Sequence, residues 1–511
     1  MKPPSKKTPD TSSPLAFDDA PGKVTSLADD ALIAFDNLAD LAGNLISPSV
    51  RLGVTGLSRS GKTIFITALV HNLIHGGRLP LFEPHAGGRI ARAFLTPQPN
   101  FDVPRFQYED HVRTLVEDRM WPQSTRAISE LRLTVEYESA SAWNRTFGSG
   151  RLNIDIVDYP GEWLLDLPLL GRTYAQWSRQ ALNLARAGKR EKLAAQWRAL
   201  LAGADPRGSA DEQKALELAS AFTAYLRQCR EDETALSTLP PGRFLMPGDL
   251  EGSPALTFSP LDVASDEKPA KDSLHAMMDA RYEAYKSVVV KPFFREHFAR
   301  LDRQIVLVDV LQAINAGPEA VVDLEIALAD ILACFRPGKG SILSTLFGPR
   351  IDRILFAATK ADHLHHENHD RLEALLERLV GAAAERARFA GAKVDVLALA
   401  AIRATREALA KQGKEELPVI VGTPLEGETI DGERFDGKTQ TAIFPGDLPE
   451  DPNALLEVAQ GKAAGKDALP HLRFVRFRPP ELEKTAEGLR LSLPHIRLDR
   501  ALSFLLDDKL A

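Results

Sequence analysis

The sequence predicts an α/β fold, in which helices flank a mainly parallel β-sheet. Segments 303–314, 352–362 and 392–402 each begin with or contain a continuous apolar run such as "IVLV" or "ILFAA". Such runs are typical of strands buried on both faces of a parallel sheet. Helical stretches such as "HDRLEALLERLVGAAAERARF" lie between and after them. This alternation of strand and helix patterns indicates an α/β protein.

The first 164 residues contain a tail, a helix and the beginning of the sheet. Residues 1–23 have the composition of a disordered tail. A helix is predicted at 24–47, where Ser26 and Asp29 have the spacing of a capping box. Residues 48–164 would form the first part of the core. Its predicted elements are strands at 50–56, 128–137 and 150–159 and a helix at 62–77.

A long insertion is predicted to divide the core. Residues 165–300 are mostly helical and charged, and core strands return in 301–416. About 200 residues separate the strand at 150–159 from the segment at 352–362, which is far more than one crossover helix needs. Residues 417–450 alternate in polarity between glycine-containing turns, so a small β-hairpin insertion is predicted there. Residues 451–511 are predicted to pack on the core and to end in a helix capped by Asp499.

Composition and charge exclude several classes of protein. Hydrophobic residues make up 44% and charged residues 26%, as in ordinary globular proteins. The formal net charge of −7 argues against a dedicated nucleic-acid-binding protein. No run approaches the ~18 apolar residues of a transmembrane helix, which leaves peripheral membrane contact open. Two distant cysteines, Cys229 and Cys334, and an amino terminus without a signal-peptide core predict a reducing, cytoplasmic location.

The strongest motif is "GLSRSGKT" at 56–63, which matches the phosphate-binding pattern G-x-x-x-x-G-K-[ST] between a predicted strand and a predicted helix. In such a loop, backbone N–H groups point at phosphate oxygens beside a helix N-terminus. Lys62 would reach the β- and γ-phosphates, and Thr63 would bind Mg²⁺ through its hydroxyl. The predicted phosphate contacts of the loop are Gly56, Ser58, Arg59, Ser60, Gly61, Lys62 and Thr63. Arg59 could act as a catalytic cation or face outward and pair with an acidic neighbour, and the second arrangement is favoured.

A second motif, D-x-x-G, follows the strand at 150–159. Asp158 ends this apolar strand and is predicted to hold Mg²⁺, directly or through water. Gly161 would let its N–H contact a γ-phosphate, so that the turn senses whether that phosphate is present. Asp309 is the rival metal carboxylate, but no glycine turn follows it.

Glu162 follows this turn, where related hydrolases often carry a water-orienting glutamine. Its carboxylate could accept a hydrogen bond from the attacking water, which makes it a candidate catalytic residue with Lys62 and Arg59. Close to a polyanion its charge would be repelled. We therefore weigh two arrangements: Glu162 turns inward once cations offset the repulsion, or it points away and pairs with an arginine until a partner reorients the turn. The second is favoured.

The remaining Mg²⁺ hydroxyl should come from the loop before the strand at 128–137. Ser124 and Thr125 are both available, and Thr125 is preferred. Thr96 is the alternative.

Base recognition is predicted at "TKAD", residues 359–362, directly after a strand. The motif resembles the [NT]-K-x-D element of GTPases. The Asp362 carboxylate could accept hydrogen bonds from both N1–H and the exocyclic amine of guanine, while adenine offers no matching pair. The stem of Lys360 would stack on the base beside Thr359, and the backbone of Ala401 or Ile402 would contact the guanine oxygen.

Two other clusters are given less weight. "DHLHHENHD" contains His365 and His369, which could share a helical face, but a solvated helix start is favoured over a zinc site. The basic stretch "RAGKREKLAAQWR" is interpreted as a solvated helix face.

With these motifs in place, the chain resembles the YcjX-like P-loop NTPases of proteobacteria. The resemblance rests on stretches such as "VRLGVTGLSRSGKTIFITALV", "DYPGEWLLDLPLL", "PGRFLMPGDL", "TKADH" and "LPHIRLDRALSFLL", and it covers nearly the whole chain after the tail. It implies a Ras-like GTPase core with a large helical insertion, guanine nucleotide binding, and an association with envelope or phage-shock stress.

The prediction is a GTP-binding protein that uses GTP/GDP and Mg²⁺, hydrolyses GTP slowly and acts as a nucleotide-controlled switch. The helical insertion is the expected contact for an unknown protein partner. Two alternatives are an ATP-using P-loop enzyme and a non-catalytic scaffold stabilised by nucleotide.

Overall fold

The computed structural model describes residues 48–511 except for several segments. The residues outside the description are 124, 126, 141–149, 187, 233–238, 265–267, 299, 334–350, 413–414, 460–471 and 483–491. The predicted tail, the predicted helix at 24–47, Ser124 and Cys334 therefore lie outside the described residues.

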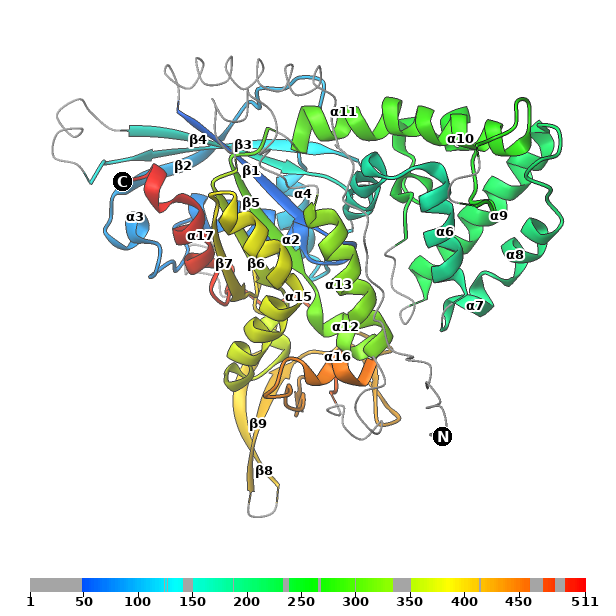
Figure 1. Ribbon diagram of the computed structural model, residues 1–511. Coiled ribbons are helices and arrows are strands. Elements are labelled where there is room, and N and C mark those ends of the chain that lie inside the picture. The colour runs from blue at the N-terminus through cyan, green and yellow to red at the C-terminus, as the bar shows by residue number, and fades with distance from the viewer. Residues whose placement is uncertain are drawn as a thin grey trace, which may run out of the picture.

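A seven-stranded sheet occupies the centre of the molecule (Figure 1), in the order β2-β3-β4-β1-β5-β6-β7. Its strands are β1 Ser49–Gly56, β2 Ile90–Thr96, β3 Ser129–Tyr137, β4 Gly150–Asp158, β5 Arg303–Val308, β6 Arg353–Ala358 and β7 Lys393–Ala398. The run from β4 to β7 is parallel, whereas β3 is antiparallel to both of its neighbours, β2 and β4. The predicted mixed α/β class with a mainly parallel sheet is confirmed. The edge strand β2 was not predicted.

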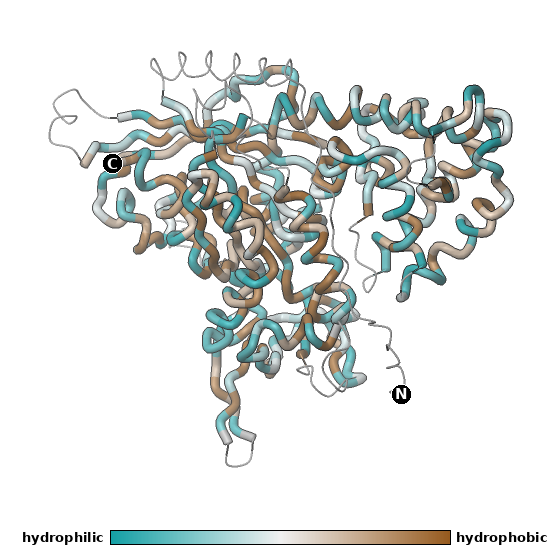
Figure 2. Tube along the Cα trace, viewed as in Figure 1, coloured by the Kyte–Doolittle hydropathy of each residue, from teal (hydrophilic) through white to brown (hydrophobic). Residues whose placement is uncertain are grey.

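The apolar runs are continuous because both faces of the sheet are covered. On β5, Ile305 and Leu307 pack in one hydrophobic cluster, while Val306 and Val308 pack in another. Figure 2 shows the corresponding hydrophobic strands at the centre of the molecule. The first cluster includes α2 (Lys62–Ile74), α4 (Tyr108–Val116) and α17 (Leu498–Leu506). The second includes α12 (Val310–Ala316), α13 (Pro318–Ala333) and α15 (His369–Phe389).

A helical lobe lies to one side of the sheet (Figure 1). It contains η1 Gly161–Gly171, α6 Tyr174–Ala185, α7 Arg190–Leu193, α8 Ala195–Ala202, α9 Glu212–Glu231, α10 Leu274–Tyr285 and α11 Lys291–Phe293. Its core is aromatic: Trp177 stacks on Tyr282 with ring centroids 5.2 Å apart, and Trp197 stacks on Tyr225 at 5.5 Å. Offset aromatic pairs of this kind add about 0.5–1.5 kcal/mol beyond the burial of their area. The lobe therefore has a hydrophobic core, which also includes Val157 of β4 and Ile331 of α13.

A β-hairpin projects from the bottom of the molecule in the view of Figure 1. It consists of β8 (Arg406–Gln412) and β9 (Glu415–Gly422), and β9 also pairs with β12 (Thr441–Ile443). The predicted start at residue 417 is wrong, because the first strand lies in the segment 301–416 assigned to the core. This strand, "REALAKQ", is charged and projects into solvent, so it carries no apolar run that would reveal it.

The carboxyl-terminal helix α17 packs in the same cluster as α2. The predicted cap is wrong: Asp499 lies in the first turn, behind Arg497, which occupies the N-cap position. Asp499 instead accepts a hydrogen bond from Leu81 N at 3.1 Å and so joins α17 to a neighbouring loop. Other short elements include α3 Glu83–Ala86, β10 Thr429–Ile430, β11 Glu433–Arg434 and α16 Ala454–Ala459. Among the described residues, no helix is both long and apolar enough to cross a bilayer.

Candidate functional site

A cavity of about 290 Å³ lies beyond the carboxyl ends of the parallel strands, where open α/β sheets commonly bind ligands. Loops that follow β1, β4, β6 and β7 line it. The predicted site residues in its wall are Ser58, Arg59, Ser60, Gly61, Lys62, Thr63, Thr125, Gly161, Glu162, Thr359, Lys360, Asp362, Ala401 and Ile402. Gly56 and Asp158 end β1 and β4 beside this wall. The fold thus gathers motifs that are up to about 350 residues apart in the sequence.

Lys62, the first residue of α2, reaches back across the predicted phosphate-binding loop to its first residues. Lys62 Nζ donates hydrogen bonds to Gly56 O at 2.9 Å and to Leu57 O at 3.2 Å. Burial lowers the pKa of the Lys62 ammonium, while the negative charges of Asp158 and Glu162 act against that shift. The Ser60 hydroxyl is buried and has no hydrogen-bond partner among the described residues. A phosphate entering the loop would satisfy both groups better than the protein alone does.

Three oxygen-bearing side chains meet next to this lysine. Thr125 Oγ1 donates to Asp158 Oδ2 at 2.6 Å and lies 3.1 Å from Thr63 Oγ1. Asp158 Oδ1 is buried without a hydrogen-bond partner among the described residues. Burial raises the pKa of Asp158 to about 6, against the effects of Lys62 and the Thr125 hydrogen bond. This set of hard oxygen donors, with one unpaired carboxylate oxygen, fits Mg²⁺, which would favour the ionised form.

The rival metal ligands lie elsewhere. Thr96 Oγ1 is 2.9 Å from Thr134 Oγ1 on the neighbouring strand β3. Asp309 caps α12 by accepting a hydrogen bond from Gln312 N at 3.0 Å, and its other oxygen pairs with Lys360 Nζ. Both alternatives are therefore engaged in structural contacts.

The turn after β4 touches the phosphate-binding loop directly. A Cβ atom on Gly161 would lie 2.3 Å from Gly56 O and 2.8 Å from Lys62 Nζ. Only glycine allows this approach, so any other residue would push the turn away from the loop. A shift of a bound phosphate or of Lys62 would therefore displace Gly161.

Glu162, the next residue, pairs with an arginine, as in the second arrangement considered above, and it also lines the cavity. Its side chain is only 3% exposed, and Oε1 lies 3.1 Å from Arg230 Nη2 of helix α9. The guanidinium N–H is not aligned for a hydrogen bond with this oxygen, so the contact is an ion pair. The arginine that pairs with the turn therefore comes from the helical lobe.

Arg59 is exposed and has a left-handed backbone conformation, with φ of 63°. It lies on the rim of the cavity. Among the described residues, no acidic side chain forms an ion pair with it. The predicted acidic partner of Arg59 is therefore not found among the described residues.

The residues predicted to recognise the base also line the cavity. Asp362 is buried, and its Oδ2 accepts a hydrogen bond from Ala404 N at 2.8 Å. Thr359 is anchored to β5 by a hydrogen bond from its N–H to Val308 O at 2.9 Å. Lys360 has φ of 62°, and its ammonium pairs with Asp309. No described hydrogen bond uses the N–H of Ala401 or Ile402, which leaves both as donors for a ligand.

Sequence reasoning missed an aromatic wall of the cavity. Trp121 and Phe477 both line it, and Trp121 Nε1 donates to Phe477 O at 2.6 Å. His363 packs edge-on against Phe477, with ring centroids 5.3 Å apart. About 350 residues separate Trp121 from Phe477, and neither belongs to a recognisable motif, so no sequence signal could have paired them.

A mostly parallel α/β sheet with a glycine-rich loop at the end of β1 is consistent with a P-loop GTPase. The chain belongs to the YcjX-like family, DUF463, whose model matches residues 50–510. It is similar to the "Ras-like GTPase YcjX" of Escherichia coli (strain K12), with 39% identity over 93% of this chain and 99% of that protein. The protein of the same name from Shewanella oneidensis is 34% identical over 90% of this chain and 94% of its own length. The predicted family is confirmed, and the names of these relatives support a GTPase-like function.

Proposed function

We propose that the protein binds GTP together with Mg²⁺ in this cavity, hydrolyses it slowly and uses the cycle as a switch. One observation carries the proposal: a single cavity joins the phosphate loop and the Thr63–Thr125–Asp158 cluster to the buried carboxylate of Asp362. The carboxylate can accept two hydrogen bonds from the guanine edge, for which adenine has no equivalent. The printed names of the relatives support the same nucleotide.

Nucleotide competition and single-turnover hydrolysis test this function. GTP and GDP should displace a fluorescent guanine nucleotide from the full chain at least about 100-fold better than ATP does, because a site built for a polar base edge leaves buried groups unpaired with the wrong base. Hydrolysis should require Mg²⁺. Equal affinity for ATP would support an ATP-using enzyme, and tight GTP binding without any turnover would support a scaffold.

The turn that senses the phosphate is also the docking site of the helical lobe. Asp166 accepts hydrogen bonds from Gly242 N at 2.7 Å and from Tyr285 Oη at 2.6 Å. A Cβ on Gly242 would lie 1.8 Å from Glu162 O, so the "PPGRF" segment packs tightly on the turn. The Arg243 guanidinium lies 3.3 Å from the Trp163 ring centroid. These contacts support an output role for residues 165–300, including contact with a protein partner.

The Glu162–Arg230 ion pair is proposed to hold the resting, slow state. Replacing Arg230 with alanine leaves a buried carboxylate without its cation, which is costly. Glu162 should then turn toward Lys62 and bound Mg²⁺, where it can orient water. Single-turnover GTP hydrolysis of Arg230→Ala should rise at least about threefold, equivalent to roughly 0.7 kcal/mol of activation barrier.

Two further variants test whether the faster rate of Arg230→Ala comes from Glu162. Glu162→Ala in the Arg230→Ala background should abolish the gain, because the water-orienting group is gone. Arg227→Ala, which changes an exposed arginine on the same helix, should leave the rate unchanged. A slower Arg230→Ala enzyme would instead identify Arg230 as a cation that stabilises the transition state. A cytoplasmic location enters this proposal through the two distant cysteines, and a role in envelope or phage-shock stress enters it only through the family resemblance.

A further inference from the structure

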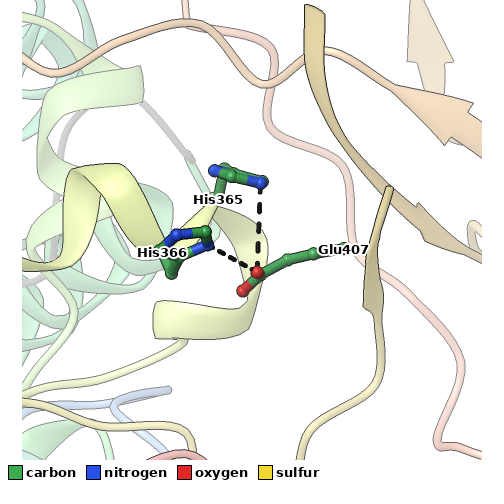
Figure 3. Close-up of side chains that lie close together, drawn as sticks. All are labelled: His365, His366 and Glu407. Carbon is green, nitrogen blue, oxygen red and sulfur yellow. Dashed lines mark hydrogen bonds and ion pairs between the residues drawn. The ribbon is translucent and has the colours of Figure 1, made fainter. Parts of the chain in front are cut away.

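Two adjacent histidines and a glutamate converge outside the nucleotide cavity. Figure 3 shows His365, His366 and Glu407 pointing toward one another. His366 Nδ1 lies 2.7 Å from Glu407 Oε2, and His365 Nε2 lies 3.9 Å from the same oxygen. One potential ligand atom from each residue lies within 4.8 Å of the other two. The sequence analysis weighed His365 with His369 and favoured a solvated helix start; in the structure His369 Nε2 lies 2.9 Å from Ala361 O and takes no part in this cluster.

The spacing of these atoms suits a small tetrahedral cation. Ligand atoms about 2.1 Å from a tetrahedral centre lie about 3.4 Å apart. The two distances from Glu407 Oε2 fall on either side of that value. The three ligand atoms lie within 4.8 Å of one another, so side-chain adjustments of roughly 1.4 Å or less would bring all three to coordination distance.

The chemistry of the donors selects the kind of metal. Two imidazoles and one carboxylate are typical Zn²⁺ ligands and leave a position for water, whereas Mg²⁺ prefers oxygen ligands alone. A metal would take the place of the hydrogen bond between His366 Nδ1 and Glu407 Oε2. Arg403 Nη2 lies 3.5 Å from the other oxygen of the glutamate, Oε1, and so leaves Oε2 free to face the histidines.

The environment of His365 adds an independent observation. Its side chain is 6% exposed, and Nδ1 is buried without a hydrogen-bond partner among the described residues. The nearest carboxylate to Nδ1 is Glu367 Oε2 at 3.8 Å. A metal-bound histidine commonly donates its second ring N–H to such a carboxylate. Coordination through Nε2 would orient the ring and give Nδ1 that partner.

We propose that His365, His366 and Glu407 form a Zn²⁺ site that fastens the segment carrying Asp362 to the β8–β9 hairpin. The histidines follow Asp362 by three and four residues, and Glu407 lies on β8. The same two segments already meet where Ala404 N and Thr405 Oγ1 donate to Asp362. Zinc adds a second connection beside this one. The metal site does not depend on the proposed GTPase function, but its influence on guanine binding does.

The test uses the nucleotide-free, chelator-treated full chain. Co²⁺ should give a visible absorption band characteristic of nitrogen and oxygen ligands at one equivalent, and Zn²⁺ should abolish the band. Competition with a chromophoric chelator then gives the Zn²⁺ affinity. His366→Ala and Glu407→Gln should each weaken this affinity at least about tenfold, because each removes one of three ligands. His75→Ala, which removes an exposed histidine at the end of α2, is the matched control and should bind zinc as the wild type does.

Thermal unfolding provides the second measurement. Zn²⁺ should raise the melting temperature of the wild type and of His75→Ala, because it binds only the folded state, and should raise it less in the two site variants. Equal zinc affinity in wild type, His366→Ala and Glu407→Gln would overturn the proposal. Since zinc is measured without nucleotide, a failure of guanine selectivity would contradict the proposed function and leave the metal result unaffected.

Discussion

Replacing Lys62 with alanine is expected to weaken GTP binding at least about 100-fold, because charge-assisted hydrogen bonds to phosphate contribute about 1.5–3 kcal/mol each. The ammonium is buried at the start of α2 and donates hydrogen bonds to the carbonyls of Gly56 and Leu57. Those carbonyls remain in the variant and cannot bind an anion. The change also removes the positive charge beside Asp158 and Glu162, which further disfavours a polyphosphate.

Equilibrium binding of a fluorescent GTP analogue measures this effect. Lys286→Ala is the matched control, since Lys286 is also a largely buried lysine but lies in the helical lobe, where it pairs with Glu283. Its loss tests the general cost of removing a buried lysine and should leave GTP affinity within about twofold. A folded Lys62→Ala protein that binds GTP as well as the control would show that the phosphates lie elsewhere.

The second large effect is expected for Asp362→Asn, which should reduce GTP affinity by about 3 kcal/mol, or roughly 100-fold. Guanine presents N1–H and an exocyclic amine, both donors, to this side chain. An asparagine offers one acceptor and one donor group, so a donor faces a donor in a buried site. The remaining asparagine oxygen can still accept the hydrogen bond from Ala404 N, which should preserve the local fold.

A change of base distinguishes lost recognition from lost structure. Xanthosine triphosphate carries an oxygen in place of the exocyclic amine, so it should bind Asp362→Asn better than GTP does, with the opposite order in the wild type. Asp370→Asn serves as the control, because Asp370 is an exposed aspartate at the start of α15. If Asp362→Asn keeps the wild-type preference for GTP over the xanthine nucleotide, the assignment of the base pocket is wrong.

Local patterns in the sequence were sufficient for the family, for the mainly parallel sheet and for most strands near the site. These features depend on residues that are adjacent or periodic: a loop of eight residues between strand and helix, and apolar runs that alternate between the two covered faces. The edge strand β2 escaped because "IARAFLT" mixes polar and apolar residues, as expected of an edge strand, and its Arg92 pairs across the sheet with Glu136. Strand β8 was not predicted for a similar reason, since its charged residues project into solvent.

The sequence by itself determined which chemical groups the site could contain: a phosphate loop, a carboxylate with a glycine turn, and a buried aspartate after a later strand. It could also predict that Glu162 would pair with an arginine. Only the tertiary structure decided which arginine, because Arg230 lies 68 positions away on a helix of another lobe. The aromatic wall of Trp121 and Phe477 and the His365–His366–Glu407 cluster likewise join residues from separate segments. Such contacts depend on how whole elements pack, and no local spacing in the chain encodes them.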